Sequence, residues 1–246
     1  MKRYLLLYCL SATMATMPVF AGTITLNFNS LPSTQGFSYL NDGGFLTETQ
    51  VFSVSADVLE QNSIGGGTHD YAYRDPGVVA DSPFEIDWTA KLIAEELSQS
   101  NNFYGFAIGV ATTTQSYDLG LGAGGIDLEN GDSEYIIPAS SLSAAGLSLH
   151  DYHHYTMLGN IAAGTWSFFI DGTFWATGSA HFRILPIPNG ILLGDITDGP
   201  NAQGDTSAFS FTQSSATPEP ASFWPLAGIA AAVLIRQRAK RGKRIA

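Results

Sequence analysis

The chain has 246 residues, and its 11 lysines and arginines face 22 aspartates and glutamates, for a net charge of −11. Most cations lie at the two ends, so residues 22–217 hold three cations against 21 anions, a charge of −18. A body this acidic argues against a nucleic-acid partner and against docking on an anionic membrane, while it leaves room for Ca²⁺. The single cysteine, Cys9, lies in the first apolar stretch, which excludes disulfides and cysteine-based metal sites from the body.

The first 21 residues have the order of a secretory signal peptide. Two cations at positions 2 and 3 precede an apolar run over residues 4–10 that continues weakly toward residue 20. Val19-Phe20-Ala21 then offers small side chains at the two positions that a signal peptidase reads. We therefore expect cleavage before Gly22 and export of the mature protein. A buried N-terminal helix is the alternative.

The body, residues 22–212, alternates apolar and polar side chains with the period of two that is typical of half-buried strands. The clearest alternation runs from Phe84 to Ala94, where a helix over Lys91–Leu97 is the alternative. Shorter alternations predict strands at residues 23–28, 51–58, 103–110, 117–121, 135–137, 152–158, 165–170, 173–177 and 208–212. Asp171-Gly172 predicts a two-residue hairpin turn. These features indicate one all-β domain, a two-sheet sandwich.

The second half of the body resembles the concanavalin A-like or laminin-G-like jelly roll over roughly residues 84–212. Three segments carry the resemblance: His153-His154-Tyr155, the Trp166 strand with its Asp171-Gly172 hairpin, and Gly190-Ile-Leu-Leu-Gly194-Asp195. That family includes lectins, glycan-binding modules, glycoside hydrolases and adhesion domains. The resemblance therefore implies a jelly-roll sandwich without deciding its function.

One strand allows the hydrolase alternative to be examined. Laminarinase-type glucanases of this fold carry Glu, Asp and Glu on one strand, and retaining hydrolysis needs two carboxyl groups about 5–5.5 Å apart. Glu85-Ile86-Asp87 matches the first two positions, but Ala90 stands where the acid belongs. The sequence also has no Gly-x-Ser-x-Gly nucleophile elbow. We predict that the protein is not an enzyme.

Three histidines, His150, His153 and His154, raise the question of zinc. On a strand, His153 and His154 point to opposite faces, and His150 is too far along to share one small ion with His154. We expect one neighbouring imidazole to pack inward and the other to be exposed.

Ca²⁺ is the better candidate for an ion, because oxygen donors cluster in two predicted loops, residues 126–132 and 195–201. The candidate ligands are Asp127, Glu129, Asp132, Asp195 and Asp198. The alternative is that these residues serve only as turn formers. No cofactor is therefore certain.

Glycan contact combines aromatic faces with polar side chains that bind hydroxyl groups. Candidate contacts lie where tyrosines alternate with polar residues in predicted loops: Tyr71, Tyr73, Arg74, Tyr104 and Tyr152. The alternative for each tyrosine is a place in the core. An extracellular polysaccharide is the expected partner.

The last 30 residues resemble the PEP-CTERM sorting signal. After a polar linker at residues 213–217 come Pro218-Glu219-Pro220, an apolar run over residues 221–235, and a basic tail over residues 236–244 that opens with Arg236 and Arg238. The apolar run spans roughly 22 Å as a helix, which is workable with flanking residues, and the cations keep the tail cytoplasmic. The resemblance implies processing by an exosortase, a membrane protease-transferase of Gram-negative bacteria that make exopolysaccharide. A permanent single-span anchor is the alternative.

The sequence thus predicts an exported, exosortase-processed protein of the cell surface, outer membrane or exopolysaccharide matrix of a Gram-negative bacterium. Its C-terminal helix would hold it transiently in the inner membrane. We expect the β-sandwich to bind a glycan without catalysis. A structural or adhesion protein without a glycan pocket is the alternative, and a glycoside hydrolase is a third.

Overall fold

The computed structural model describes residues 22–41, 46–66, 69–73, 82–96, 105–131, 133–181, 189–196 and 201–213, without the side chains of residues 69, 72 and 73. All of them belong to one compact unit, residues 1–215. The expected signal peptide and sorting signal lie outside the described residues, as do residues 214–217 of the predicted linker. Gln213, predicted as the first linker residue, is instead the buried last residue of a strand, Ala202–Gln213. Within the described part of the chain, no helix has the length and apolar character to cross a membrane.

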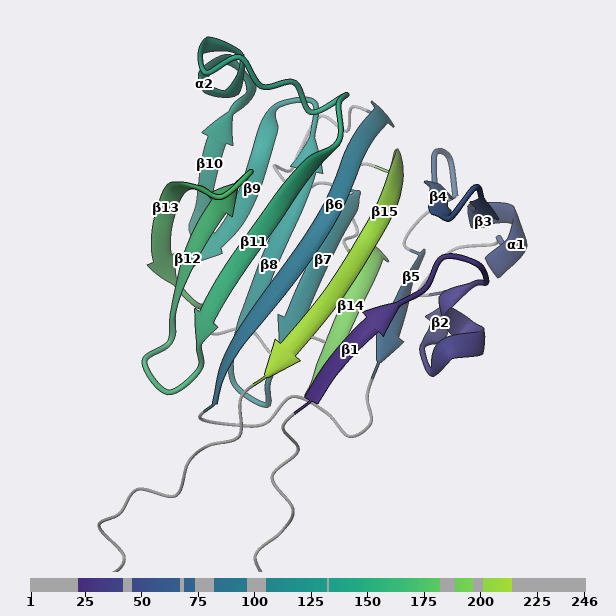
Figure 1. Ribbon diagram of the computed structural model, residues 1–246, viewed down its shortest axis with the longest axis horizontal. Coiled ribbons are helices and arrows are strands. Elements are labelled where there is room, and N and C mark those ends of the chain that lie inside the picture. The colour runs from purple at the N-terminus through teal and green to yellow at the C-terminus, as the bar shows by residue number, and fades with distance from the viewer. Residues whose placement is uncertain are drawn as a thin grey trace, which may run out of the picture. The chain divides into compact units, whose positions relative to one another are not determined.

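The larger sheet has eight antiparallel strands and forms one layer of the sandwich (Figure 1). Its main path runs in the order β13 (Thr173–Ser179), β12 (Thr165–Ile170), β11 (His153–Asn160), β6 (Pro83–Glu95), β15 (Ala202–Gln213), β4 (Val58–Asn62) and β3 (Phe52–Ser55), and β1 (Gly22–Leu26) also pairs with β15.

The smaller sheet has seven antiparallel strands and forms the other layer. Its order is β10 (Ser133–Pro138), β9 (Gly125–Asn130), β8 (Ser116–Gly122), β7 (Phe106–Ala111), β14 (Gly190–Asp195), β5 (His69–Tyr73) and β2 (Ser38–Leu40). Short helical turns η1 (Pro32–Gln35), α1 (Glu48–Val51) and α2 (Ala139–Ala144) connect strands. The all-β, two-sheet sandwich predicted from the sequence is therefore confirmed.

The core lies between the two sheets and is rich in aromatic rings. Trp88 of β6 is fully buried, with its ring centroid 4.9 Å from that of Phe106 and 5.8 Å from that of Tyr155. Its indole nitrogen donates a hydrogen bond to the hydroxyl of Thr206 at 3.0 Å. A buried indole needs such a partner, because its N–H would otherwise lose its hydrogen bond to water.

The predicted strand at residues 84–94 is confirmed as β6, which continues to Glu95 in place of a helix from Lys91. The Asp171-Gly172 turn is confirmed as well: it joins β12 to β13, and both residues have positive φ, 49° and 74°. Such φ values suit an Asp-Gly pair in a two-residue hairpin.

The single strand predicted at residues 51–58 is wrong. Val51 ends α1, and the remainder forms a hairpin of β3 and β4 whose turn is Ala56-Asp57, with φ of 51° and 62°. Alanine at positive φ is rare, so the sequence carries no turn signal there. The apolar alternation continued through the turn and concealed it.

Gly159 of β11 makes a close contact that tests the packing of the core. A Cβ at this position would collide with the ring of Phe84, which itself packs at 4.9 Å against Tyr117 and at 5.8 Å against Phe211. We expect Gly159→Ala to lower the free energy of unfolding by about 1–3 kcal/mol, the usual cost of overpacking, as measured by urea denaturation. The exposed Thr173→Ala serves as control, and equal effects of the two substitutions would contradict this packing.

Candidate functional site

The outer face of the larger sheet carries polar side chains in rows that cross the strands. Alternate residues of a strand point to the same face, so residues paired in the ladders line up across the sheet. One such row consists of Thr23, Thr212, Glu85, Leu158, Ser167 and Thr177. At about 4.8 Å per strand, the row extends about 24 Å.

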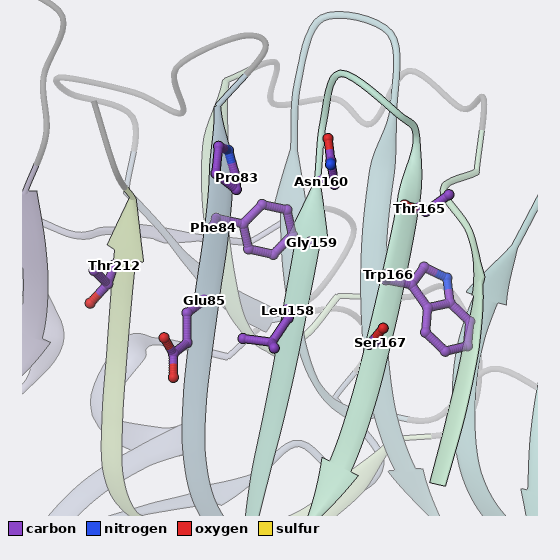
Figure 2. A pocket seen from close by; sticks show the side chains of 10 residues that line it. All are labelled: Pro83, Phe84, Glu85, Leu158, Gly159, Asn160, Thr165, Trp166, Ser167 and Thr212. Atoms are coloured by element: carbon purple, nitrogen blue, oxygen red, sulfur yellow. The ribbon is translucent and has the colours of Figure 1, made fainter. Parts of the chain in front are cut away.

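An open groove of about 430 Å³ follows part of this row over β15, β6, β11 and β12 (Figure 2). Its lining residues are Pro83, Phe84, Glu85, Leu158, Gly159, Asn160, Thr165, Trp166, Ser167 and Thr212. The side chains of Phe84 and Trp166 are buried beneath the sheet, so the groove floor contains backbone at these positions and at Gly159.

The groove combines hydrogen-bonding groups with apolar surface. The Oδ1 atom of Asn160 accepts a hydrogen bond from the Ala163 N–H at 3.0 Å. The side-chain NH₂ group of Asn160 is not used in that bond and can donate to a ligand. The exposed carboxylate of Glu85 has no hydrogen bond or ion pair within the described part of the chain. Leu158 is 40% exposed between Glu85 and Ser167. A ligand that presents hydroxyl groups and C–H surface matches this lining.

Beside the groove, on the same face, Asp87 has its own partners. It accepts a hydrogen bond from the Thr156 hydroxyl at 2.9 Å, and its Oδ1 atom lies 2.8 Å from His154 Nε2. The side chain of His154 is 50% exposed, whereas that of His153, on the opposite face, is 12% exposed and lies 2.7 Å from Asp171. Partial burial works against ionisation of Asp171, but the backbone N–H of His154 and the imidazole of His153 hold its pKa below the ordinary value.

Among the predicted glycan contacts, Tyr152 lies on this outer face. Tyr152 is 41% exposed, and Lys91 Nζ lies 4.8 Å from the centroid of its ring. Lys91 pairs with Asp205 at 3.1 Å, and the Tyr152 hydroxyl donates to the same carboxylate at 3.3 Å. Partial burial, followed by the charge of Asp205, raises the pKa of Tyr152 to about 12. The ring is held in place while one surface stays available.

Tyr71 is buried, and its prediction as a glycan contact is wrong. Its ring lies 4.4 Å from that of Phe52, and its hydroxyl donates to Glu48 at 2.9 Å. Because β5 is paired with β14 and with β2, Tyr71 is fixed facing the core. The side chain of Tyr73 lies outside the described residues, as do the predicted contacts Arg74 and Tyr104.

The described candidate ligands of the two predicted calcium loops, Asp127, Glu129 and Asp195, lie on strands. Residues 126–130 are strand β9, paired with β8 and β10 on its two sides, so the prediction of a loop there is wrong. Asp195 lies on β14 and accepts a hydrogen bond from the Ser63 hydroxyl in the interior, on the opposite face of the sheet from Asp127 and Glu129. Asp132 and Asp198 lie outside the described residues. Among the residues described, no three His, Cys, Asp or Glu side chains form a group able to hold a metal ion.

Asp127 and Glu129 point away from the core on β9, and both are nearly buried, at 7% and 8% exposure. Glu129 lies 3.1 Å from the imidazole of His181. Burial, together with the nearby carboxylates of Glu134, Glu129 and Asp118, raises the pKa of Asp127 to about 8. Asp127 Oδ1 has no hydrogen-bond partner in the described part of the chain. This carboxyl group is therefore largely protonated at neutral pH.

No protein-family model and no curated protein matches the chain. Among solved structures, a carbohydrate esterase of the Shiga toxin-encoding bacteriophage phi24B is 12% identical, with a TM-score of 0.50 and coverage of 78% of this chain and all of that one. A sialidase is 7% identical, with a TM-score of 0.50 and coverage of 79% of this chain but 18% of its own. The serotype D botulinum neurotoxin binding domain is 13% identical over 78% of this chain and 48% of that one, with a TM-score of 0.47. At these low identities, the likeness to the esterase and the sialidase shows the fold alone.

Sequence reasoning did not identify most of the groove. Ser167 and Thr212 are ordinary polar residues on predicted strands, whereas Asn160 lies two residues beyond the strand predicted at 152–158, and only the strand register brings the three together. For Ser167 and Thr212, the outward position in the alternation was the available signal. Glu85 was examined only as a remnant of a hydrolase pattern.

The pKa of Asp127 gives a prediction about pH. The folded protein keeps the Asp127 proton until about pH 8, whereas the unfolded chain loses it near the ordinary value of 3.8. Asp127 therefore stabilises the fold fully below the unfolded pKa, and this contribution is lost as pH rises through 8, by up to about 1.4 kcal/mol per pH unit. We expect Asp127→Asn to show a flatter pH dependence of the free energy of unfolding between pH 5 and pH 8.

Urea denaturation at several pH values measures this difference. Asp57→Asn, in an exposed turn, is the matched control, because asparagine suits the positive φ at that position. A pH profile of Asp127→Asn parallel to that of the unmodified protein would show that Asp127 is ionised in the fold.

Proposed function

We propose that the protein is an exported, concanavalin A-like module that binds an extracellular polysaccharide without catalysis. The observation that carries the proposal is the open groove across the outer face of the larger sheet. Its lining offers an amide, hydroxyl groups and a carboxylate beside the exposed side chain of Leu158. Sugar hydroxyls match the polar groups, and the C–H face of a sugar ring matches the apolar surface.

The direction of the groove supports a chain-like ligand over a compact one. It crosses four neighbouring strands and continues the row that reaches β1 on one side and β13 on the other. Hydroxyl groups of Thr23, Thr212 and Ser167 recur along that row. An extended polymer can contact several of these positions at once, and each additional contact slows its dissociation.

Two features of β6 support binding without hydrolysis at the groove. Asp87 is engaged by Thr156 and His154, and Ala90, the position where the glucanase pattern places its acid, faces the core. A retaining mechanism requires two free carboxyl groups about 5–5.5 Å apart, so the engagement of Asp87 and the alanine at position 90 both favour binding over hydrolysis here.

A glycoside hydrolase, the third possibility after a structural or adhesion protein, has its best support on the other sheet. Asp127 carries a raised pKa beside Glu129, and pairs of carboxyl groups with different pKa values serve as acid and base. Both residues are at most 8% exposed, however, which favours a structural role for them.

Export and exosortase processing are proposed from the two ends of the sequence alone. The signal-like residues 1–21, the Pro218-Glu219-Pro220 tripeptide and the basic tail after residue 235 support this part of the proposal. We accordingly propose a location at the cell surface or in the exopolysaccharide matrix of a Gram-negative bacterium.

The test is a screen of the 22–213 fragment against a glycan array and matrix polysaccharides, with Ca²⁺ and with chelator. We expect saturable binding to at least one extended glycan. Leu158→Ser and Asn160→Ala should each weaken it about fivefold or more, since each removes a contact worth about 1 kcal/mol. Thr25→Ala, on the same face but outside the groove, is the control and should bind normally. If no glycan binds under either condition, the structural or adhesion role takes its place.

A further inference from the structure

Glu85 is the only ionisable residue among the ten that line the groove. Other charged groups on the same face have partners: Lys91 with Asp205, His154 with Asp87, and Glu60 with the Ser53 hydroxyl at 2.8 Å. Glu85 has none within the described residues. Its carboxylate is an acceptor without a donor, placed where the ligand is proposed to bind.

The negative charge around Glu85 favours a ligand that carries positive charge. Lys91 is the only lysine or arginine within the described part of the chain, and it lies six residues along β6 from Glu85. That separation is about 20 Å along a strand, well beyond the screening length of about 8 Å at physiological salt. Residues 22–217 together carry a charge of −18. Uronate or sulfate groups would therefore be repelled from the groove, and an amine would be attracted.

We infer that the groove selects a polysaccharide whose sugars carry free amino groups, an inference that rests on the proposed function. The ammonium group of an amino sugar donates hydrogen bonds to Glu85. Asn160 lies two residues along β11 from Leu158, the direct neighbour of Glu85, so its amide reaches a hydroxyl group of the same or the next sugar. Leu158 and Pro83 contact the ring between them. The charge of Glu85 thus adds a preference for amino sugars, whereas the neutral contacts of the groove would suit many glycans.

The experiment compares three oligosaccharide probes of equal length on the full chain: glucosamine oligomers, N-acetylglucosamine oligomers of the same linkage, and a uronate oligomer. Binding is measured by calorimetry at about pH 5.5, below the pKa of a free amine. We expect the glucosamine oligomer to bind about fivefold more tightly than its acetylated counterpart, the effect of one partly exposed ion pair. The uronate oligomer should bind most weakly, and added salt should reduce the preference.

Two variants assign the preference to Glu85. Glu85→Gln should bring the affinity for the glucosamine oligomer down to that for the acetylated oligomer, while Glu60→Gln, an exposed carboxylate on the same face outside the groove, should leave the difference intact. Thermal unfolding checks that both variants fold. Equal affinities of the unmodified protein for charged and acetylated oligomers, or a preference unchanged in Glu85→Gln, would overturn the inference and leave the proposed function standing. Failure of every probe here and of every glycan on the array would remove the proposed function itself.

Discussion

The long antiparallel ladder between β6 and β15 determines both faces of the larger sheet. Along it, Phe84, Ile86 and Trp88 face the core while Glu85 and Asp87 face outward, so one register supplies the packing and the site. The ladder shifts register at Gln203/Gly204, and a Cβ at Gly204 would touch the ring of Phe106 from the other sheet. If β6 shifted by one residue relative to β15, its core side chains would face solvent and its groove side chains would face the core, because side chains alternate strictly along a strand.

Pairing of charges then distinguishes the groove from the rest of its face. Lys91 forms an ion pair with Asp205, and Asp87 forms a hydrogen bond with His154, at positions that are partly exposed to solvent. Such contacts contribute little to stability, but they engage the charged groups locally. Glu85 keeps its charge uncompensated among the described residues. On this polar surface, the carboxylate of Glu85 stays available to a ligand while those of Asp87 and Asp205 have partners. The difference arises because the described part of the chain has a single lysine and no arginine, so few cations are present to pair with carboxylates.

The part of the fold that could be predicted from sequence is the part governed by local pattern. The alternation of β6 and the Asp-Gly turn depend on neighbours in the chain, so both could be predicted. Strand β9 was mistaken for a loop because Asp127 and Glu129 suggest solvent, whereas its partners on both sides keep them nearly buried. The inward position of Tyr71 and the gathering of groove residues from four strands depend on long-range pairing, which a single sequence does not display.

The most direct measurement is amide chemical-shift mapping of the 22–213 fragment during titration with an oligosaccharide that binds on the array. We expect the shifts to concentrate on the outward residues of β6, β11 and β12, around Glu85, Leu158 and Asn160. Shifts concentrated instead on β8 and β9, around Asp127 and Glu129, would contradict the assignment of the site to the larger sheet.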